Sequence, residues 1–230
     1  MSTPDSIQSF DAERAATYDN NIRAVAPGYE VLHEAIAAMM DASLTPTAHM
    51  LVVGAGTGRE IVEMGRAHPE WRFTAVDPSS AMLDQCRATL AGTDLADRVE
   101  YVCERVEDLS GGSRFDGATA IFVSHFLQEM DAKRRFFETI HDHLAPQAPF
   151  GIADLYADDT ERGDRRRAWR AWVARKCGRE EMERRFSRIE RDISFLQENR
   201  LQALLHCAGF ASLTRLYQCF QWGAWVTRAA

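Results

Sequence analysis

Apolar and polar positions follow two alternating patterns along the first two thirds of the chain. Five short runs are rich in apolar residues, as in strands that are buried on both faces: 49–54, 72–77, 99–104, 117–122 and 149–156. The segments 59–67, 79–91 and 132–144 between them repeat apolar residues at the three-to-four spacing of a helix. Strands that alternate with helices of this length predict a parallel, doubly wound sheet in an α/β fold.

Two further helices are predicted before the first strand. A polar helix over 8–25 ends at Pro27-Gly28, and an amphipathic helix follows over 29–42. The turn at 45–47 then leads into the strand. Residues 1–45 are therefore expected to form an N-terminal helical segment.

Residues 158–198 interrupt the alternation. Twelve Lys and Arg residues stand against six Asp and Glu residues between positions 161 and 191. Apolar residues persist at helical spacing at Trp169, Trp172, Val173, Met182 and Phe186. The segment therefore predicts a helical insert of two amphipathic helices with a basic outer face. Its arginines form either a solvated face or a surface that attracts an anionic substrate.

The chain ends on a different pattern. A helix over 198–207 and a turn at 208–210 precede two strands, 212–219 and 221–228. Two strands without a helix between them predict an antiparallel addition to the sheet edge. The whole of 1–230 is thus expected to form one α/β domain with a seven-stranded, mostly parallel sheet and an antiparallel C-terminal strand.

Composition and charge narrow the function classes. With 46% apolar and 27% charged residues the chain resembles an ordinary globular protein, and its net charge of −7 argues against general nucleic-acid binding. No run reaches the 18–20 apolar residues of a membrane span. The N-terminus lacks the basic start and apolar core of a signal peptide, and the five cysteines form no C-x-x-C pair. We therefore expect a cytoplasmic protein with reduced thiols.

The stretch "LVVGAGTGRE" carries the most specific chemistry. Gly54, Gly56 and Gly58 follow a predicted strand and precede a predicted helix, so a ligand can approach bare backbone and free N–H groups there. Asp77 ends the next strand, which places its carboxylate beside the glycine turn, where it can accept both hydroxyls of a ribose. A dinucleotide site would need glycine at position 59, which is Arg59. An NAD-dependent dehydrogenase stays an alternative.

The G-x-G-x-G spacing resembles that of class I S-adenosylmethionine-dependent methyltransferases. "HMLVVGAGTGREIVEM" looks like their first motif, "FTAVDPSSAMLDQCR" like their second strand and helix, and "YVCERVEDL" like the segment with the adenine contact. "RFDGATAIFVSHFLQEM" and "FFETIHDHLAPQAPFGIADLY" resemble their fourth and fifth strands, and "LLHCAGFASLTRLYQCFQWGAWVTR" their ending. "IRAVAPGYEVLHEAI" suggests the branch near small-molecule methyltransferases and carboxy-S-adenosylmethionine synthases. The resemblance implies a Rossmann-like fold, with residues 1–45 as a cover and 158–198 as a lid over the substrate.

The resemblance also implies a set of residues that bind S-adenosylmethionine. The glycine turn would contact the cofactor through its backbone, Asp77 would hold the ribose, and Ser79 or Met82 would flank the adenine. Ile121 and Phe122 would pass the sulfonium, and Arg23 would pair with the cofactor's carboxylate unless it is a solvated helix arginine. The full set of candidates is Gly54, Ala55, Gly56, Gly58, Asp77, Pro78, Met82, Arg105, Val106, Glu107, Ile121, Phe122, Arg23 and Tyr18.

Three positions depart from the family's pattern. Val52 stands two residues before the first glycine, where the family has Asp or Glu, which removes a polar group near the methionine end of the cofactor. Arg105 replaces an Asp at the adenine position, so adenine recognition would rest on the Val106 N–H and the side chain of Glu107 or Arg105. Gln147-Ala148 replaces a Gly-Gly pair and alters only a loop.

Three residues are candidates for catalysis. His125 follows the fourth strand and would serve as general base with a pKa near neutrality, or else is a satisfied histidine at a helix start. Asp154 ends the fifth strand at the ligand-binding edge and would touch the substrate. Tyr18 lies on the N-terminal helix, either over the site or in plain packing. No metal site is expected, because His141 and His143 point to different faces of a helix.

These observations predict a methyltransferase that acts on a small-molecule acceptor by in-line SN2 displacement, a reaction that needs mainly alignment and exclusion of water. The acceptor is expected to be anionic if the arginines face it, and a homodimer is an open expectation. Two alternatives stay open. One is an enzyme that modifies S-adenosylmethionine itself, as carboxy-S-adenosylmethionine synthases do for tRNA wobble uridine modification. The other is a non-catalytic nucleoside- or RNA-binding module, against which the acidic composition argues.

Overall fold

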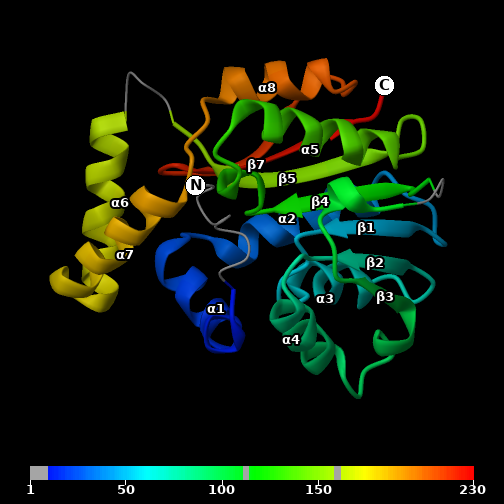
Figure 1. Cartoon of the computed structure of the whole chain (residues 1–230), viewed down its shortest axis with the longest axis horizontal. Coiled ribbons are helices and arrows are strands. Elements are labelled where there is room, and N and C mark those ends of the chain that lie inside the picture. The colour runs from blue at the N-terminus through cyan, green and yellow to red at the C-terminus, as the bar shows by residue number, and fades with distance from the viewer. Residues whose placement is uncertain (1–9, 111–113, 158–161) are drawn as a thin grey trace.

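A seven-stranded sheet forms the centre of the computed structural model, which describes residues 10–110, 114–157 and 162–230. Its strands lie in the order β3-β2-β1-β4-β5-β7-β6 (Figure 1). Their bounds are β1 His49–Val53, β2 Arg72–Val76, β3 Val99–Val102, β4 Gly117–Ile121, β5 Pro149–Leu155, β6 Thr214–Cys219 and β7 Trp222–Arg228. Neighbours from β3 to β5 are parallel, and β7 runs antiparallel to both β5 and β6. The predicted fold class is confirmed.

Helices cover both faces of the sheet (Figure 1). On one face lie α2 (Tyr29–Asp41), α3 (Arg59–Gly65) and α4 (Ser80–Leu90), and on the other lie α5 (Met130–Asp142) and α8 (Glu198–Cys207). Strand side chains alternate between the two layers. Val52 packs with the α2 and α3 side, and Leu51 and Val53 pack with the α5 and α8 side. Each layer therefore buries a continuous apolar core, as doubly wound sheets require.

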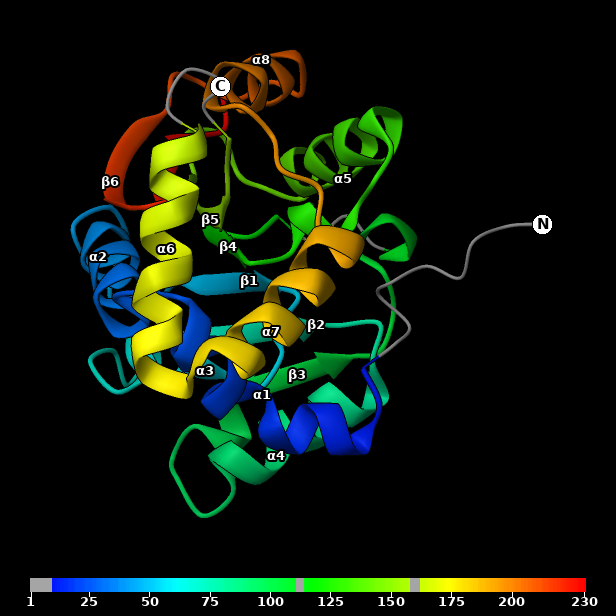
Figure 2. The same ribbon diagram turned by 90° about the vertical axis from the view of Figure 1, so that its left-hand side faces the viewer.

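Three helices lie together beyond one end of the sheet. They are α1 (Ala12–Val25), α6 (Arg162–Cys177) and α7 (Arg179–Asp192), which Figure 2 places in front of the strands. Trp169 of α6 is fully buried, and its indole N–H donates to the Val25 carbonyl at 2.7 Å. Its ring packs edge-on against Phe186 and Trp222. A buried tryptophan between three elements fixes α6 on the body of the protein, so the apolar stripe of the insert is a packing surface.

The predicted elements exist in the predicted order, and their ends differ by a few residues. The third strand stops at Val102 rather than 104, and the second helix of the insert stops at Asp192 rather than near 198. From Ile193 to Gln197 the chain is irregular and returns to the sheet, where Leu196 forms an isolated bridge with Tyr156. The start of the predicted helix 8–25 and the residues 158–161 of the insert lie partly outside the described residues. Among the described residues, no helix is long and apolar enough to cross a membrane.

Candidate functional site

The glycine turn joins β1 to α3 and has three left-handed residues. Gly54, Gly56 and Gly58 have φ values of 65°, 53° and 84°, a region that residues with a Cβ enter only at a cost. A Cβ at Gly54 would lie 2.4 Å from Val123 Cγ2, and one at Gly58 would lie 2.7 Å from Cys86 Sγ. At Gly56 the nearest atom would be 3.5 Å away. Gly54 and Gly58 are thus needed for packing, whereas a Cβ at Gly56 would make only ordinary van der Waals contact.

Asp77 lies against this turn, as the sequence predicted. Val53 and Val76 are paired in the parallel β1–β2 ladder, so the segments that follow them meet at the same edge of the sheet. The Gly56 N–H donates to Asp77 Oδ2 at 3.0 Å, and the Ser79 N–H donates to Oδ1 at 2.9 Å. Burial raises the pKa of Asp77, and these two backbone donors oppose that rise. Each carboxylate oxygen keeps a lone pair for a ligand hydroxyl.

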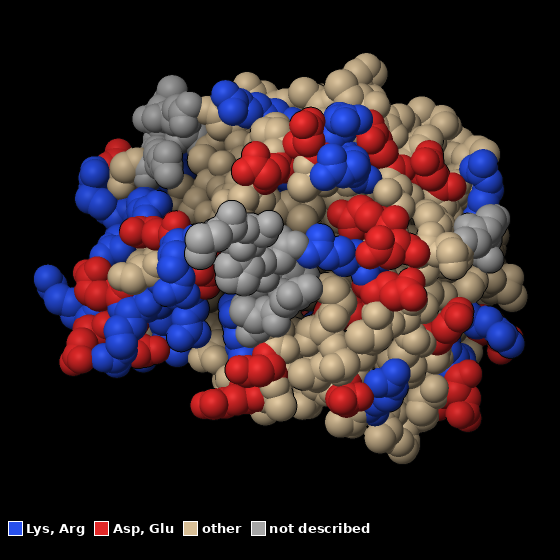
Figure 3. Space-filling view, viewed as in Figure 1, with Lys and Arg blue, Asp and Glu red and all other residues tan. Residues whose placement is uncertain are grey.

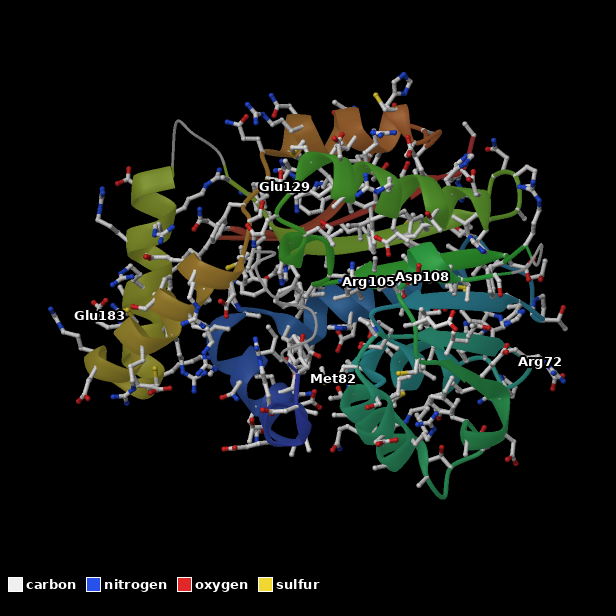
Figure 4. The ribbon with its side chains drawn as sticks, in the orientation of Figure 1. Arg72, Met82, Arg105, Asp108, Glu129 and Glu183 are labelled. Atoms are coloured by element: carbon white, nitrogen blue, oxygen red, sulfur yellow. The ribbon has the colours of Figure 1, made fainter. Side chains whose placement is uncertain are left out.

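A cavity of about 40 Å³ adjoins the turn. Its lining brings together five predicted cofactor residues: Gly54, Pro78, Arg105, Val106 and Glu107. Met82 is buried on α4, and its Cε is the atom nearest to a Cβ built on Gly56. Figure 4 labels Met82 and Arg105, which come from α4 and from the loop after β3. The bare backbone at Gly56 and the carboxylate beside it fit a nucleoside cofactor, and the individual contacts stay predictions.

A second cavity, of about 230 Å³, lies between α1, α7 and the residues that follow β4. Its apolar wall includes Phe10, Tyr18, Ile22, Val25, Phe122, Phe126, Ile189, Ile193 and Trp222. Its charged lining is Arg14, Arg184, Arg185, Arg188, Glu181 and Asp192, so arginines outnumber carboxylates among the described residues. Figure 3 shows Lys and Arg gathered over α6 and α7 among acidic neighbours. The insert's arginines thus form partly a paired outer surface and partly a cavity wall.

His125 lines the larger cavity, and its ring is hydrogen-bonded to the buried carboxylate of Asp154. It lies in the short helical turn Ser124–Phe126 after β4, and its Nδ1–H donates to Asp154 Oδ1. Ser124 donates its hydroxyl proton to the other oxygen of Asp154. A carboxylate on Nδ1 fixes the tautomer and leaves Nε2 for another partner. This is the arrangement of an oriented general base.

Asp154 itself is turned away from the cavity. It is 5% exposed at the end of β5 and is absent from the cavity lining. Burial alone would raise the pKa of Asp154, but His125, Lys133 and Ser124 lower it below its usual value. Both carboxylate oxygens of Asp154 have protein partners, Ser124 on one and His125 on the other, and its contact with the substrate stays a prediction.

Lys133 completes this network from α5. It is 1% exposed, and its ammonium donates to the Ser124 carbonyl oxygen. Burial lowers the pKa of Lys133, and the nearby Asp154 opposes that effect. The sequence analysis missed Lys133, because a lysine on an amphipathic helix is normally assigned to solvent.

Phe122 occupies the junction between β4 and the larger cavity. Its φ of 62° is unusual for an aromatic residue and marks backbone strain at the ligand edge of the sheet. The ring packs edge-on against Trp222 with centroids 4.9 Å apart. Ile121 before it is buried in the core beside α2. Of the two residues predicted to pass the sulfonium, Phe122 lines the larger cavity and Ile121 is packed in the core.

Tyr18 and Arg23 of α1 have different surroundings. Tyr18 lines the larger cavity, and burial, followed by the charge of Glu60, raises its pKa. Its hydroxyl therefore stays protonated at neutral pH and is suited to donate a hydrogen bond rather than to act as a base. Arg23 pairs with Glu30 at 2.6 Å and with Asp19 at 3.5 Å. Its predicted contact with the cofactor's carboxylate would require a change of partner.

Comparisons with known proteins agree with this geometry. Residues 51–150 match the family model described as a methyltransferase domain. The chain is 24% identical to a carboxy-S-adenosyl-L-methionine synthase of Citrobacter koseri over 95% of its length and 90% of that protein. It is 31% identical to the O-methyltransferase resE of Aspergillus sclerotiorum over 56% of its length and 48% of that protein.

A solved structure shares the fold over the full length. The 1,6-didemethyltoxoflavin-N1-methyltransferase of Burkholderia thailandensis, with bound 1,6-didemethyltoxoflavin and S-adenosylhomocysteine, superimposes with a TM-score of 0.61 at 22% identity. The match covers 100% of this chain and 93% of that one. Fold and site together define a nucleoside-binding α/β enzyme. The match of residues 51–150 to a methyltransferase domain and these relatives support a class I S-adenosylmethionine-dependent methyltransferase with S-adenosylmethionine as its cofactor.

Proposed function

We propose that the protein transfers a methyl group to a small anionic acceptor in the larger cavity, with His125 as general base. The observation that carries the proposal is the placement of His125. Its ring lines the cavity while its Nδ1 is bonded to Asp154. A general base is needed only where the acceptor atom is protonated at neutral pH. The pair of His125 and Asp154, called the dyad below, therefore favours a hydroxyl or a similar weak acid as acceptor.

The proposed acceptor is an anion because of the cavity's charges. Arg184 and Arg185 pair with Glu181 at 2.7–2.8 Å. Among the described residues no hydrogen bond or ion pair is present for Arg188, although it lines the cavity. An arginine facing an apolar cavity favours a carboxylate or phosphate partner, which it can bind through two hydrogen bonds. The aromatic wall would then hold the body of the acceptor.

Each proposed residue would contribute a separate part of the reaction. When bound, the cofactor supplies an activated methyl group on a positive sulfur. Asp77 and the glycine turn would hold the nucleoside, and the arginines would orient the acceptor. His125 Nε2 would take the acceptor's proton as the new bond to the methyl carbon forms. Asp154 would stabilise the charged imidazole that results, while α1 and α7 exclude water.

A screen with two variants tests this proposal. Wild-type protein with S-adenosylmethionine and a panel of hydroxy acids and their methyl esters should release S-adenosylhomocysteine with acids in preference to esters. His125→Gln should lower kcat on the best acceptor about 10²–10⁴-fold and leave S-adenosylhomocysteine affinity unchanged. Asp77→Ala should weaken S-adenosylhomocysteine binding at least tenfold, and Asp84→Ala, an exposed carboxylate on α4, should not. Wild-type protein that fails to bind S-adenosylhomocysteine would refute the proposal.

A second candidate is the modification of the cofactor itself. It is favoured by the similarity to a carboxy-S-adenosyl-L-methionine synthase along nearly the whole of both chains, and by arginines that face the same cavity. The mass of the nucleoside that copurifies with the protein distinguishes the two. A carboxylated nucleoside would favour this candidate, and S-adenosylmethionine or S-adenosylhomocysteine would favour methyl transfer. The cytoplasmic location and the homodimer stay predictions from the sequence.

A further inference from the structure

A buried carboxylate lies immediately beyond the glycine turn and has no role in the dyad. Glu60 is the second residue of α3 and is 6% exposed. Its Oε1 atom has no hydrogen-bond partner among the residues that the structure describes. An unpaired carboxylate oxygen in the interior costs free energy unless a ligand supplies a donor. The position of Glu60 therefore calls for a donor from outside the chain.

The surroundings of Glu60 place it at the inner side of the predicted cofactor site. Groups from every element packed around it interact with it electrostatically: Tyr18 and Asp19 of α1, Tyr29 of α2, Arg59 of α3, Asp77 after β2 and Cys86 of α4. Asp19 is tied to the turn, because the Thr57 hydroxyl donates to its Oδ1 at 2.7 Å. Three carboxylates thus surround the turn, on the side covered by α1.

The neighbouring cations are paired elsewhere. Arg59 binds Glu63 at 2.6 Å, and Arg23 binds Glu30 at the same distance. Burial, and then the nearby Asp77, raise the pKa of Glu60 to about 8, although its own backbone N–H and Arg59 act in the opposite direction. Asp19 and Asp77 lie near Glu60 while the neighbouring arginines are paired with other glutamates, so a positively charged ligand group would be stabilised there.

We propose that Glu60 binds the α-ammonium group at the methionine end of S-adenosylmethionine. The inference deepens the proposed function and rests on it. Two positions before the first glycine the chain has the buried, apolar Val52, so that end of the turn supplies no charged side chain. Glu60 lies two positions after the last glycine, under α1, and supplies a carboxylate from the opposite end of the same turn. An ammonium group can give Oε1 the hydrogen bond that it lacks.

The proposal has a consequence that binding measurements detect. Without ligand, Glu60 is mostly protonated at pH 7, because its pKa lies above that pH. A bound ammonium group favours the ionised carboxylate, so binding should release up to about one proton. Titration calorimetry in two buffers with different ionisation enthalpies measures the number of protons released.

The test uses two ligands that share the nucleoside. S-adenosylhomocysteine has the amino-acid end, and 5′-methylthioadenosine does not. Glu60→Gln should weaken S-adenosylhomocysteine binding at least tenfold, leave 5′-methylthioadenosine within twofold, and abolish the proton release. Asp84→Asn, an exposed carboxylate on α4 that pairs with Arg87, is the control and should change neither affinity.

The outcomes separate this inference from the proposed function. If Glu60→Gln weakens both ligands equally, or if proton release persists, Glu60 acts only on the structure of the turn and the inference fails. S-adenosylhomocysteine acetylated on its amino group gives an independent check without mutation, since the wild type should lose most of the difference between the two ligands. If the wild type binds neither ligand, the proposed function itself fails.

Discussion

The two regions proposed to bind the cofactor and the acceptor, called here the cofactor half and the acceptor half, are built in different ways. In the cofactor half, backbone dominates: three left-handed glycines, N–H groups that donate to Asp77, and a short loop after β3. In the acceptor half, side chains from α1, α7, the turn after β4 and the start of β7 meet around one cavity. The first half carries an excess of carboxylates and the second an excess of arginines. The residues of the cofactor half can be recognised from a short sequence motif. Those of the acceptor half come from segments far apart in the sequence and meet only in the folded chain.

Two alanine substitutions in the glycine turn should break the cofactor half in different ways, and they carry the largest expected effect. Gly54→Ala combines left-handed strain of about 1–2 kcal/mol with a Cβ placed 2.4 Å from Val123. Overpacking costs a further 1–3 kcal/mol, so urea unfolding should show a loss of about 3 kcal/mol. Gly56→Ala should lose only the strain, about 1–2 kcal/mol.

In a binding experiment, the order of the two effects should be reversed, with the larger loss in Gly56→Ala. A Cβ at Gly56 would lie beside Met82, where the nucleoside is proposed to bind, so Gly56→Ala should weaken S-adenosylhomocysteine binding at least tenfold in titration calorimetry. Gly54→Ala should change affinity less, once measured at a temperature where the variant is folded. Equal affinity losses in the two variants would mean that the ligand does not bind against the backbone of Gly56.

Much of the fold and of the cofactor half could be predicted from the sequence, for a physical reason. Strand runs and helix periodicity are local, and the glycine spacing followed by Asp77 places two features on adjacent parallel strands. The turn and the carboxylate do meet, through the bond from the Gly56 N–H to Asp77. The ends of elements were less certain, because tertiary contacts such as the bridge between Tyr156 and Leu196 decide where a helix stops.

The acceptor half could be predicted only in outline. His125 and Asp154 were named separately, and their pairing depends on β4 and β5 being neighbours with Ile121 beside Ala153. His125 follows the end of β4, and Asp154 lies near the end of the adjacent parallel strand β5, so the sequence pattern could have placed the two residues together. Glu60 and Lys133 have no signal in composition. Their burial depends on helices packed against them, which no local pattern specifies.

Asp154→Asn should have the next largest effect on stability, and it tests whether the negative charge of Asp154 stabilises the groups around it. The substitution removes the charge that faces His125, Ser124 and Lys133 in the interior. Losing a buried charged hydrogen-bond partner costs about 2–3 kcal/mol, so unfolding at pH 7 should show a loss of that size. The free Lys133 ammonium should account for much of it, and Lys133→Met in the same background should recover part of the loss.

The acid dependence of the same variant has a definite sign. Because the pKa of Asp154 is lowered in the folded protein, its stabilisation is present above the unfolded value of about 3.9 and is lost as pH falls through the folded pKa. The wild type should therefore lose unfolding free energy faster than Asp154→Asn between about pH 5 and pH 3. Parallel curves in urea denaturation would contradict the assignment.

Arg188→Ala sharpens the acceptor half with the smallest effect. Arg188 is exposed on α7, lines the cavity and lies near Arg14, whose pKa is lowered by burial and then by Arg188. Unfolding free energy should change by less than about 0.5 kcal/mol, because the guanidinium has no ion pair to lose among the described residues. KM for the best acidic acceptor should rise about tenfold, which corresponds to about 1.4 kcal/mol, while kcat and S-adenosylhomocysteine affinity stay near wild type.

Arg179→Ala, at the start of α7 and outside the cavity lining, is the control. If both variants raise KM alike, the long-range positive field of α7 rather than Arg188 attracts the acceptor, and adding salt should then reduce the effect of both.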